Sequence, residues 1–263
     1  GAIHSLALKS DGTVWAWGWN GSGQLGEGTT AQHLTPVQVQ GGLSGVVKIA
    51  TSGGSFNLAL KSNGTVWAWG WNYYGPCGDG SGNSQLLPVQ LPVLANVANI
   101  AAGMMHGLAL KSDGSVWTWG YNLWGNLGDG TMTSHFTPAV VTGAMATTAI
   151  AANADHSVSA RGDGTVWGWG DNTQWQLAVG SGSQWTAPVQ ATGLSGISTL
   201  VSGDAFNIAL KNDGTVWAWG GVNYNGERGT SVPISSFQLA PNPITGISGS
   251  VDVSAGESKH VLS

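Results

Sequence analysis

The sequence predicts an all-β fold, and three observations support this prediction. A segment of the form Asp/Asn-Gly-Thr/Ser-Val-Trp-x-Trp-Gly occurs five times at intervals of about fifty residues, which indicates a tandem repeat. The chain contains 43 glycines and nine prolines, and this indicates many turns between short strands because glycine supplies the positive φ of tight turns. Charged residues make up 8% of the chain, against about 25% in typical soluble domains, which is too few for helices with solvated faces.

Each repeat carries four strand patterns in the same order, named A, B, C and D below. In the second repeat they predict strands over Val46–Ala50, Phe56–Lys61, Thr65–Trp69 and Leu87–Leu91. Asn63-Gly64 stands between B and C, and Asn-Gly or Asp-Gly at this place in every repeat predicts a hairpin with a type I′ turn.

Both faces of strand C are apolar, since the tryptophans of Val-Trp-x-Trp-Gly point to one face and the small residues to the other. Sheets stacked face to face around a ring bury both faces. The sequence therefore predicts a β-propeller of four-stranded antiparallel blades, forming one domain over residues 1–263. The ten tryptophans of the repeated pair are expected to pack between blades.

The third repeat carries a family resemblance in the segments Ile100–Leu110, Asp113–Gly120 and Gly125–Gly130, together with Asn122. This pattern resembles the repeat of the regulator of chromosome condensation family, and the resemblance covers essentially the whole chain. It implies a β-propeller, usually of seven blades. The five repeats found here correspond either to five blades or to a fragment of a seven-bladed ring.

The two ends of the chain bear on this choice. Residues 1–6 match a strand B, and Val251–Ser254 match a strand A, so the last strand could complete the first blade and remove an open edge. His260–Ser263, however, duplicate the strand B pattern of the first residues. Five closed blades are narrowly favoured, and the alternatives are a longer array or a ring with one frayed terminus.

Composition excludes several classes of partner. The net charge of −5 gives no counterion-release drive toward DNA or RNA, so no nucleic-acid partner is expected. The chain has no run of eighteen apolar residues, and no membrane insertion is expected. The single cysteine, Cys77, excludes an internal disulfide framework. Low charge and repeat architecture favour an extracellular or cell-surface protein.

Candidate chemistry is weak throughout, and no catalytic residue, cofactor or metal ligand is predicted. The Gly-Ser-Gly-Gln-Leu-Gly pattern at residues 21–26 matches a dinucleotide-binding motif, but no helix pattern follows it. One repeat position carries histidine or phenylalanine, which indicates packing, with the imidazole bonded to backbone. Its occupants are His4, Phe56, His106, His156, Phe206 and His260.

Variation between the repeats separates the two ends of each blade. The turn between B and C hardly changes, as Lys61–Gly64 and Lys111–Gly114 show, whereas the A–B turns and C–D loops differ and carry aromatic residues. Loops on a rigid scaffold commonly carry recognition residues, although these aromatics could instead cap the blades. The candidate partner-binding residues are Tyr73, Tyr74, Met104, Met105, Trp124, Asp155, Trp175 and Tyr224.

The sequence is therefore interpreted as a non-enzymatic binding scaffold that recognises a protein or glycan through one loop face. Two alternatives come from the family resemblance. One is nucleotide exchange on a small GTPase, which the missing blades and the scarcity of charge oppose. The other is an inhibitor of enzymes such as β-lactamases, which the small residues in several A–B turns oppose.

Overall fold

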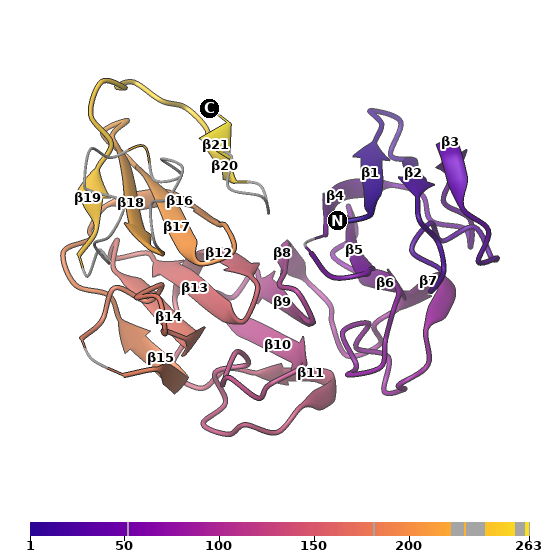
Figure 1. Ribbon diagram of the computed structural model, residues 1–263, viewed down its shortest axis with the longest axis horizontal. Helices are drawn as coiled ribbons and strands as arrows, with labels where there is room; N and C mark the ends of the chain where they lie inside the picture. The colour runs from indigo at the N-terminus through magenta and orange to yellow at the C-terminus, as the bar shows by residue number, and fades with distance from the viewer. Residues whose placement is uncertain (52, 181, 222–228, 230–239, 256–260, 263) are drawn as a thin grey trace. The chain divides into compact units, whose positions relative to one another are not determined.

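The computed structural model describes residues 1–51, 53–180, 182–221, 229, 240–255 and 261–262 (Figure 1). These residues form β-strands and turns, and no helix occurs among them. Accordingly, the described part of the chain offers no helix of a length and hydrophobicity suited to crossing a membrane. The prediction of an all-β chain is confirmed.

The strands form antiparallel sheets in which sheet order equals chain order or its reverse. The first sheet has three strands, β1 (His4–Leu8), β2 (Val14–Gly18) and β3 (His33–Gln38). The second contains β4 (Val46–Ala50), β5 (Phe56–Lys61), β6 (Val66–Gly70) and β7 (Gln85–Gln90). The third contains β8 (Val97–Ala102), β9 (His106–Lys111), β10 (Val116–Gly120) and β11 (His135–Val140).

The remaining strands continue this series. The fourth sheet contains β12 (Thr147–Asn153), β13 (His156–Arg161), β14 (Val166–Asp171) and β15 (Gln184–Gln190). The fifth contains β16 (Ile197–Ser202), β17 (Phe206–Lys211), β18 (Val216–Gly220) and β19 (Asn242–Pro243). A separate two-stranded sheet pairs β20 (Ser254–Ala255) with β21 (Val261–Leu262). Of the strand A expected over Val251–Ser254, only Ser254 lies in a strand.

Two compact units make up the chain. Unit 1 contains residues 1–122 and 133–140, and unit 2 contains residues 123–132 and 141–263. The first three sheets lie in unit 1, and the other sheets lie in unit 2. Each unit is described by itself below.

The hairpin turn between strands B and C differs from the type I′ prediction. In the B–C turn of the second sheet Gly64 has a positive φ (+75°), and Asn63 does not. The Gly64 amide donates to the Lys61 carbonyl at 2.9 Å, while the Lys61 amide donates to the Thr65 carbonyl at 3.0 Å. This is a type I turn followed by a bulge at glycine. It forms because the Asn63 side-chain oxygen accepts hydrogen bonds from the Thr65 amide and hydroxyl, at 3.2 and 2.7 Å.

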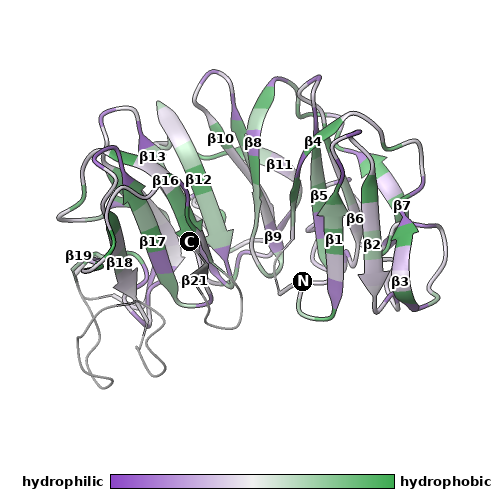
Figure 2. Ribbon diagram, turned by 90° about the horizontal axis from the view of Figure 1, so that it is seen from above, coloured by the Kyte–Doolittle hydropathy of each residue, from purple (hydrophilic) through white to green (hydrophobic). Residues whose placement is uncertain are grey.

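Within each unit, the second tryptophan of a pair packs between neighbouring blades. Trp119 is fully buried in a cluster with Phe56, Leu58 and Val66 of the preceding blade, and its Nε1 donates to the Pro76 carbonyl at 2.7 Å. Trp69 and Trp219 repeat this arrangement within unit 1 and unit 2. Figure 2 shows hydrophobic residues along strands such as β5 and β8, which contribute to this core.

In the last four blades the first tryptophan of the pair is only partly buried, whereas the second is fully buried. Trp117 is half-buried, with its ring beneath the Lys111 ammonium group, 4.4 Å from the ring centroid. Its Nε1 donates to the Ser115 hydroxyl at 3.3 Å. Trp117 also packs against the core cluster that contains Trp119, so this position joins the B–C turn to the core.

Each blade has two chemically different ends. The A–B turn and the C–D loop meet at one end, which we call the loop end; the B–C turn marks the other, the hairpin end. At the loop end the Trp71 amide donates to the Ser55 carbonyl at 2.8 Å, and the Tyr121 amide donates to the Met105 carbonyl at 2.9 Å. In unit 2 the Asp171 amide donates likewise to the Asp155 carbonyl. These bonds fix the C–D loop beside the A–B turn of its own blade.

Candidate functional site

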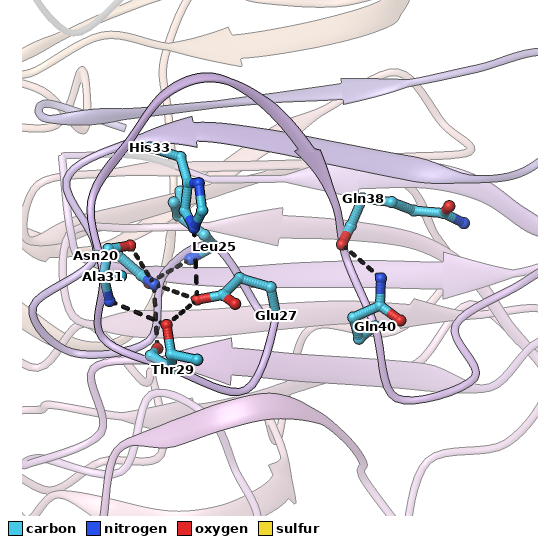
Figure 3. A network of polar contacts seen from close by, with 8 residues as sticks. All are labelled: Asn20, Leu25, Glu27, Thr29, Ala31, His33, Gln38 and Gln40. Atoms are coloured by element: carbon cyan, nitrogen blue, oxygen red, sulfur yellow. Dashed lines mark hydrogen bonds and ion pairs between the residues drawn. The ribbon is translucent and has the colours of Figure 1, made fainter.

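A buried asparagine organises the C–D loop of the first blade. The Asn20 amide nitrogen donates to Oε1 of Glu27 and to the carbonyls of Thr29 and Ala31, at 2.9 to 3.0 Å (Figure 3). Its Oδ1 accepts from the Leu25 amide at 2.8 Å. A single side chain thus closes the loop and holds it rigid at the loop end.

The same staple recurs in the second blade. The Asn72 amide nitrogen donates to Oδ1 of Asp79 and to the Ser81 and Asn83 carbonyls, and its Oδ1 accepts from the Cys77 amide. Sequence reasoning missed this role. The signal was available, because asparagine recurs at positions 20, 72, 122 and 172, and a carboxylate follows seven residues later in the first three.

The staples position an apolar groove at the loop end of unit 1. The groove has a volume of about 270 Å³ and is open to the surface. Two C–D loops and two A–B turns line it with Trp19, Ser22, Gly53, Gly54, Ser55, Trp71, Met104 and Met105. Trp19 and Met104 are each 40% exposed, and exposed large apolar side chains that lie together commonly mark a binding surface.

An aromatic cluster continues from the groove through Trp71. The Trp71 ring lies 5.8 Å from the Tyr74 ring and 6.3 Å from the Tyr73 ring. Tyr74 in turn lies 5.1 Å from Tyr121 of the next blade. Tyr73 is 66% exposed. Edge-to-face packing thus fixes these rings in place while part of their surface stays open to solvent.

The eight candidate residues divide between the two units. In unit 1, Met104 and Met105 line the groove, and Tyr73 and Tyr74 belong to the aromatic cluster. Trp124, Asp155 and Trp175 belong to unit 2. Tyr224 lies outside the described residues. Trp19, Trp71 and Tyr121 join the surface, although the sequence analysis did not select them.

Trp175 has a backbone conformation that its residue type disfavours. Its φ is +63°, whereas the corresponding positions of the first three blades are Gly23, Gly75 and Gly125, with φ between +78° and +82°. The turn is otherwise the same, because the Trp175 amide donates to the Asn172 carbonyl, as the Gly23 amide donates to the Asn20 carbonyl. A tryptophan thus takes a strained position that the other repeats give to glycine.

Three carboxylates approach one another at the loop end of unit 2. Burial, together with the negative charges of Asp171 and Asp204, raises the pKa of the Asp155 carboxyl to about 6. The Asp171 side chain accepts from Gln176 and Thr173, which keeps it in place. Among the described residues, no group of three or more His, Cys, Asp or Glu side chains has the geometry of a metal site.

The repeated histidine position contacts a side chain where a backbone contact was expected. His4 Nε2 lies 2.6 Å from Asn57 Oδ1, and His156 Nε2 lies 2.9 Å from Asn207 Oδ1. Burial lowers the pKa of His4 to about 4 and lowers that of His156, so both rings are neutral at pH 7. These histidines connect neighbouring blades within each unit and have no solvent-exposed surface for catalysis.

The hairpin end offers few side chains to a partner, because its charged side chains and tryptophans already contact one another. A Lys or Arg side chain covers the first tryptophan in every blade, at 3.7 to 5.8 Å from the ring centroid. Asp113, Asp163 and Asp213 accept from the following Ser or Thr, and these bonds lower the pKa of each carboxyl. The repeated turn chemistry is thereby accounted for structurally.

A family model described as the RCC1-like domain matches residues 1–262. The chain belongs to the RCC1-like domain family. This RCC1-like chain is 30% identical to the ultraviolet-B receptor UVR8 of Arabidopsis thaliana over 105 residues, which are 39% of the chain and 24% of the receptor. It is 38% identical to the protein RCC2 homolog of Danio rerio over 86 residues, covering 33% of the chain and 17% of that protein.

A third relative is the X-linked retinitis pigmentosa GTPase regulator homolog of Caenorhabditis elegans, 37% identical over 110 residues, or 40% of the chain and 8% of the homolog. The matches thus span a quarter or less of these relatives. Among solved structures, human WBSCR16 aligns with a TM-score of 0.87 at 26% identity, over 98% of this chain and 68% of that one.

Yeast RCC1 (Prp20), crystallised bound to Kap60, aligns with a TM-score of 0.71 at 18% identity, over 97% of this RCC1-like chain and 77% of that chain. The likeness at this identity concerns the fold. Together these matches confirm the β-propeller prediction and the family resemblance.

Proposed function

We propose that this RCC1-like chain is a non-enzymatic binding module that recognises a partner protein through the loop ends of its blades. The observation that carries the proposal is the groove between Trp19, Trp71 and Met104, continued by the aromatic cluster. Rigid aromatic anchors on a fixed scaffold are the residues that dominate the binding energy of protein interfaces. The asparagine staples supply the rigidity, since they hold the loops without a partner.

The contrast with the hairpin end supports the assignment of the face. There, cation–π stacks and turn hydrogen bonds occupy the side chains within each blade. At the loop end, large apolar side chains are left exposed. The complex of yeast RCC1 with Kap60 supports a protein as partner, and a glycan is the second ligand class that exposed tyrosine and tryptophan rings could stack on.

We further propose that the protein works outside the cell or at its surface. The support is compositional, namely a charged fraction of 8% and one cysteine, which is buried as a free thiol. Protease treatment of intact source cells tests this proposal. We expect the chain to be degraded or found in the medium, and complete protection inside intact cells would contradict it.

The binding face is tested by two triple variants compared in partner capture from the native source. Alanine at Tyr74, Trp124 and Trp175 is expected to abolish capture, because truncating an anchor costs about 2 kcal/mol or more. The matched control is alanine at Lys61, Lys111 and Lys211, which is expected to leave capture intact. The opposite result would place binding at the hairpin end and overturn the proposal.

A second candidate function is regulation of a small GTPase. The relative from Caenorhabditis elegans is named as a GTPase regulator homolog, and its similarity to this chain over 110 residues favours this function. The test is release of a fluorescent GDP analogue from a panel of small GTPases. Acceleration that the alanine triple at Tyr74, Trp124 and Trp175 removes would support this function, and absence of acceleration across the panel would exclude it for those GTPases.

A further inference from the structure

Among the described residues, the two ends of the blades differ in the charged side chains that they carry. Every charged side chain on the described A–B turns and C–D loops is a carboxylate. They are Glu27, Asp79, Asp129, Asp155 and Asp204, and Asp171 ends strand β14 at the same end of its blade. Apart from Lys48 in β4, the cationic side chains in the described part of the chain lie at the B–C turns, where four aspartates accompany them; these cations are Lys9, Lys61, Lys111, Arg161 and Lys211. The charged side chains described at the loop ends are therefore all acidic.

Two of these carboxylates belong to the loops that line the groove of unit 1. Glu27 follows Trp19 and Ser22 in the first C–D loop, and Asp79 follows Trp71 in the second. Neither has a Lys or Arg within ion-pair distance in the described part of the chain; the basic group facing Glu27 is His33, at 4.0 Å. Both carboxylates accept hydrogen bonds from the neutral amides of the asparagine staples.

The size of the groove limits what it can hold. At about 270 Å³ it lies below the range of about 300–1,000 Å³ that is usual for small-molecule sites. It is open to the surface, and tryptophan and methionine side chains form much of its wall. Methionine walls adapt to apolar side chains of different shapes. These features suit one or two apolar side chains of a protein segment better than a buried metabolite.

From the groove and the charge distribution together, we propose that the partner presents a segment in which an apolar side chain is flanked by lysine or arginine. The apolar side chain enters between Trp19, Trp71 and Met104. The flanking cations lie over the loops that carry Glu27 and Asp79, where electrostatic complementarity adds specificity and speeds association. This inference rests on the proposed function, because it names the chemistry of the partner at the loop end.

Three labelled peptides of one design test the inference on the full chain. Each has the same Met-Phe-Leu centre, flanked on both sides by two lysines, two serines or two glutamates. Binding is measured by fluorescence anisotropy at about pH 7.5. We expect the lysine peptide to bind about tenfold more tightly than the serine peptide, and the glutamate peptide to bind weakest, with the difference shrinking as salt is raised.

Matched variants assign the binding to the groove. Met104→Ala is expected to weaken binding of the lysine peptide about tenfold. Met145 is exposed near the hairpin end, and Met145→Ala is expected to leave this binding unchanged. Glu27→Gln with Asp79→Asn keeps the acceptors for the asparagine staples but removes the charges, and should abolish the preference for lysine over serine. Asp113→Asn is the charge control, since Asn63 occupies that turn position in the second blade.

The outcomes separate this inference from the proposed function. Equal binding of the three peptides, binding of none of them, or binding that Met104→Ala leaves unchanged overturns the inference. If partner capture nevertheless requires Tyr74, Trp124 and Trp175, the loop end remains the binding face and only the partner chemistry is wrong. If capture instead depends on the lysine triple, the proposed function itself fails.

Discussion

At the residue scale, the two tryptophans of each repeated pair have different roles, and sequence alone did not separate them. Both stand in an apolar strand at alternate positions, so alternation places them on one face. The second, such as Trp119, is buried between blades, whereas Trp117 lies beneath Lys111. The lysine that distinguishes them lies six residues earlier, across a hairpin whose geometry had first to be known.

Replacing these tryptophans should show the difference in stability. Trp119→Ala leaves a large cavity in the core of unit 1 and is expected to lower the free energy of unfolding by about 3–5 kcal/mol. Trp117→Ala removes a half-exposed ring and a stack worth about 1 kcal/mol, so its loss should be smaller. Urea denaturation measures both. A larger loss for Trp117→Ala would contradict the assignment of the core.

Trp175 provides a second test at this scale, because strain and function are expected to oppose each other. Trp175→Gly introduces the residue found at this position in the first three blades. Glycine adopts the positive φ without strain, and this relief stabilises the fold by roughly 1 kcal/mol. We expect a melting temperature equal to or above that of the parent chain, together with weaker partner capture. A variant that melts lower yet captures its partner normally would show that Trp175 serves packing alone.

At the scale of elements, the sequence predicted the strands closely and the turns less well. Strands β4 and β5 have the predicted bounds, and β6 begins one residue late because the Thr65 amide and hydroxyl bond to Asn63 in the turn. Strand β7 begins two residues early, at Gln85, which pairs with Gly70 beyond a shift in register. Side chains bonding to their own turn cause such differences, and alternation of hydrophobic residues does not reveal them.

The candidate site was predictable in part for the same reason. Strand topology predicts that the A–B turns and C–D loops lie at one end of each blade. The hydrogen bonds from the Trp71 amide to Ser55 and from the Tyr121 amide to Met105 confirm this prediction. The groove itself was not predictable, since it depends on how Met104 and Trp19, 85 positions apart in the printed numbering, approach one another across blades. The sequence was sufficient to select the loop aromatics as a set, but it did not predict which residues they pack against.

The A–B turn of the fourth blade should make stability depend on pH. The pKa of Asp155 is raised to about 6 in the folded protein, against a usual value of 3.8, so folding favours the protonated carboxyl. Its ionisation therefore destabilises the fold as pH rises through 6. Asp155→Asn should be more stable than the parent chain at about pH 7.5, and this advantage should shrink at about pH 4.5. Urea denaturation at both pH values measures the difference, and an advantage that grows in acid would contradict this sign.

At the scale of the whole molecule, one repeat produces blades whose two ends differ in chemistry. The hairpin end keeps the same Asp/Asn-Gly turn in all five repeats, because its cation–π stack and turn bonds stabilise each blade. The loop end is released from that requirement, since asparagine staples hold loops of differing sequence. Variation between repeats is thus concentrated where it costs little stability, and this is the end that carries the exposed aromatic and methionine side chains.

Hydrogen exchange of the chain, alone and with its captured partner, tests this account most directly. The account predicts slower exchange in the complex at the loop end of unit 1, over residues 71–75 and 103–105, with the hairpin turns at residues 61–64 and 111–114 unchanged. Protection confined to those hairpin turns, with exchange at the loop end unaltered, would contradict it.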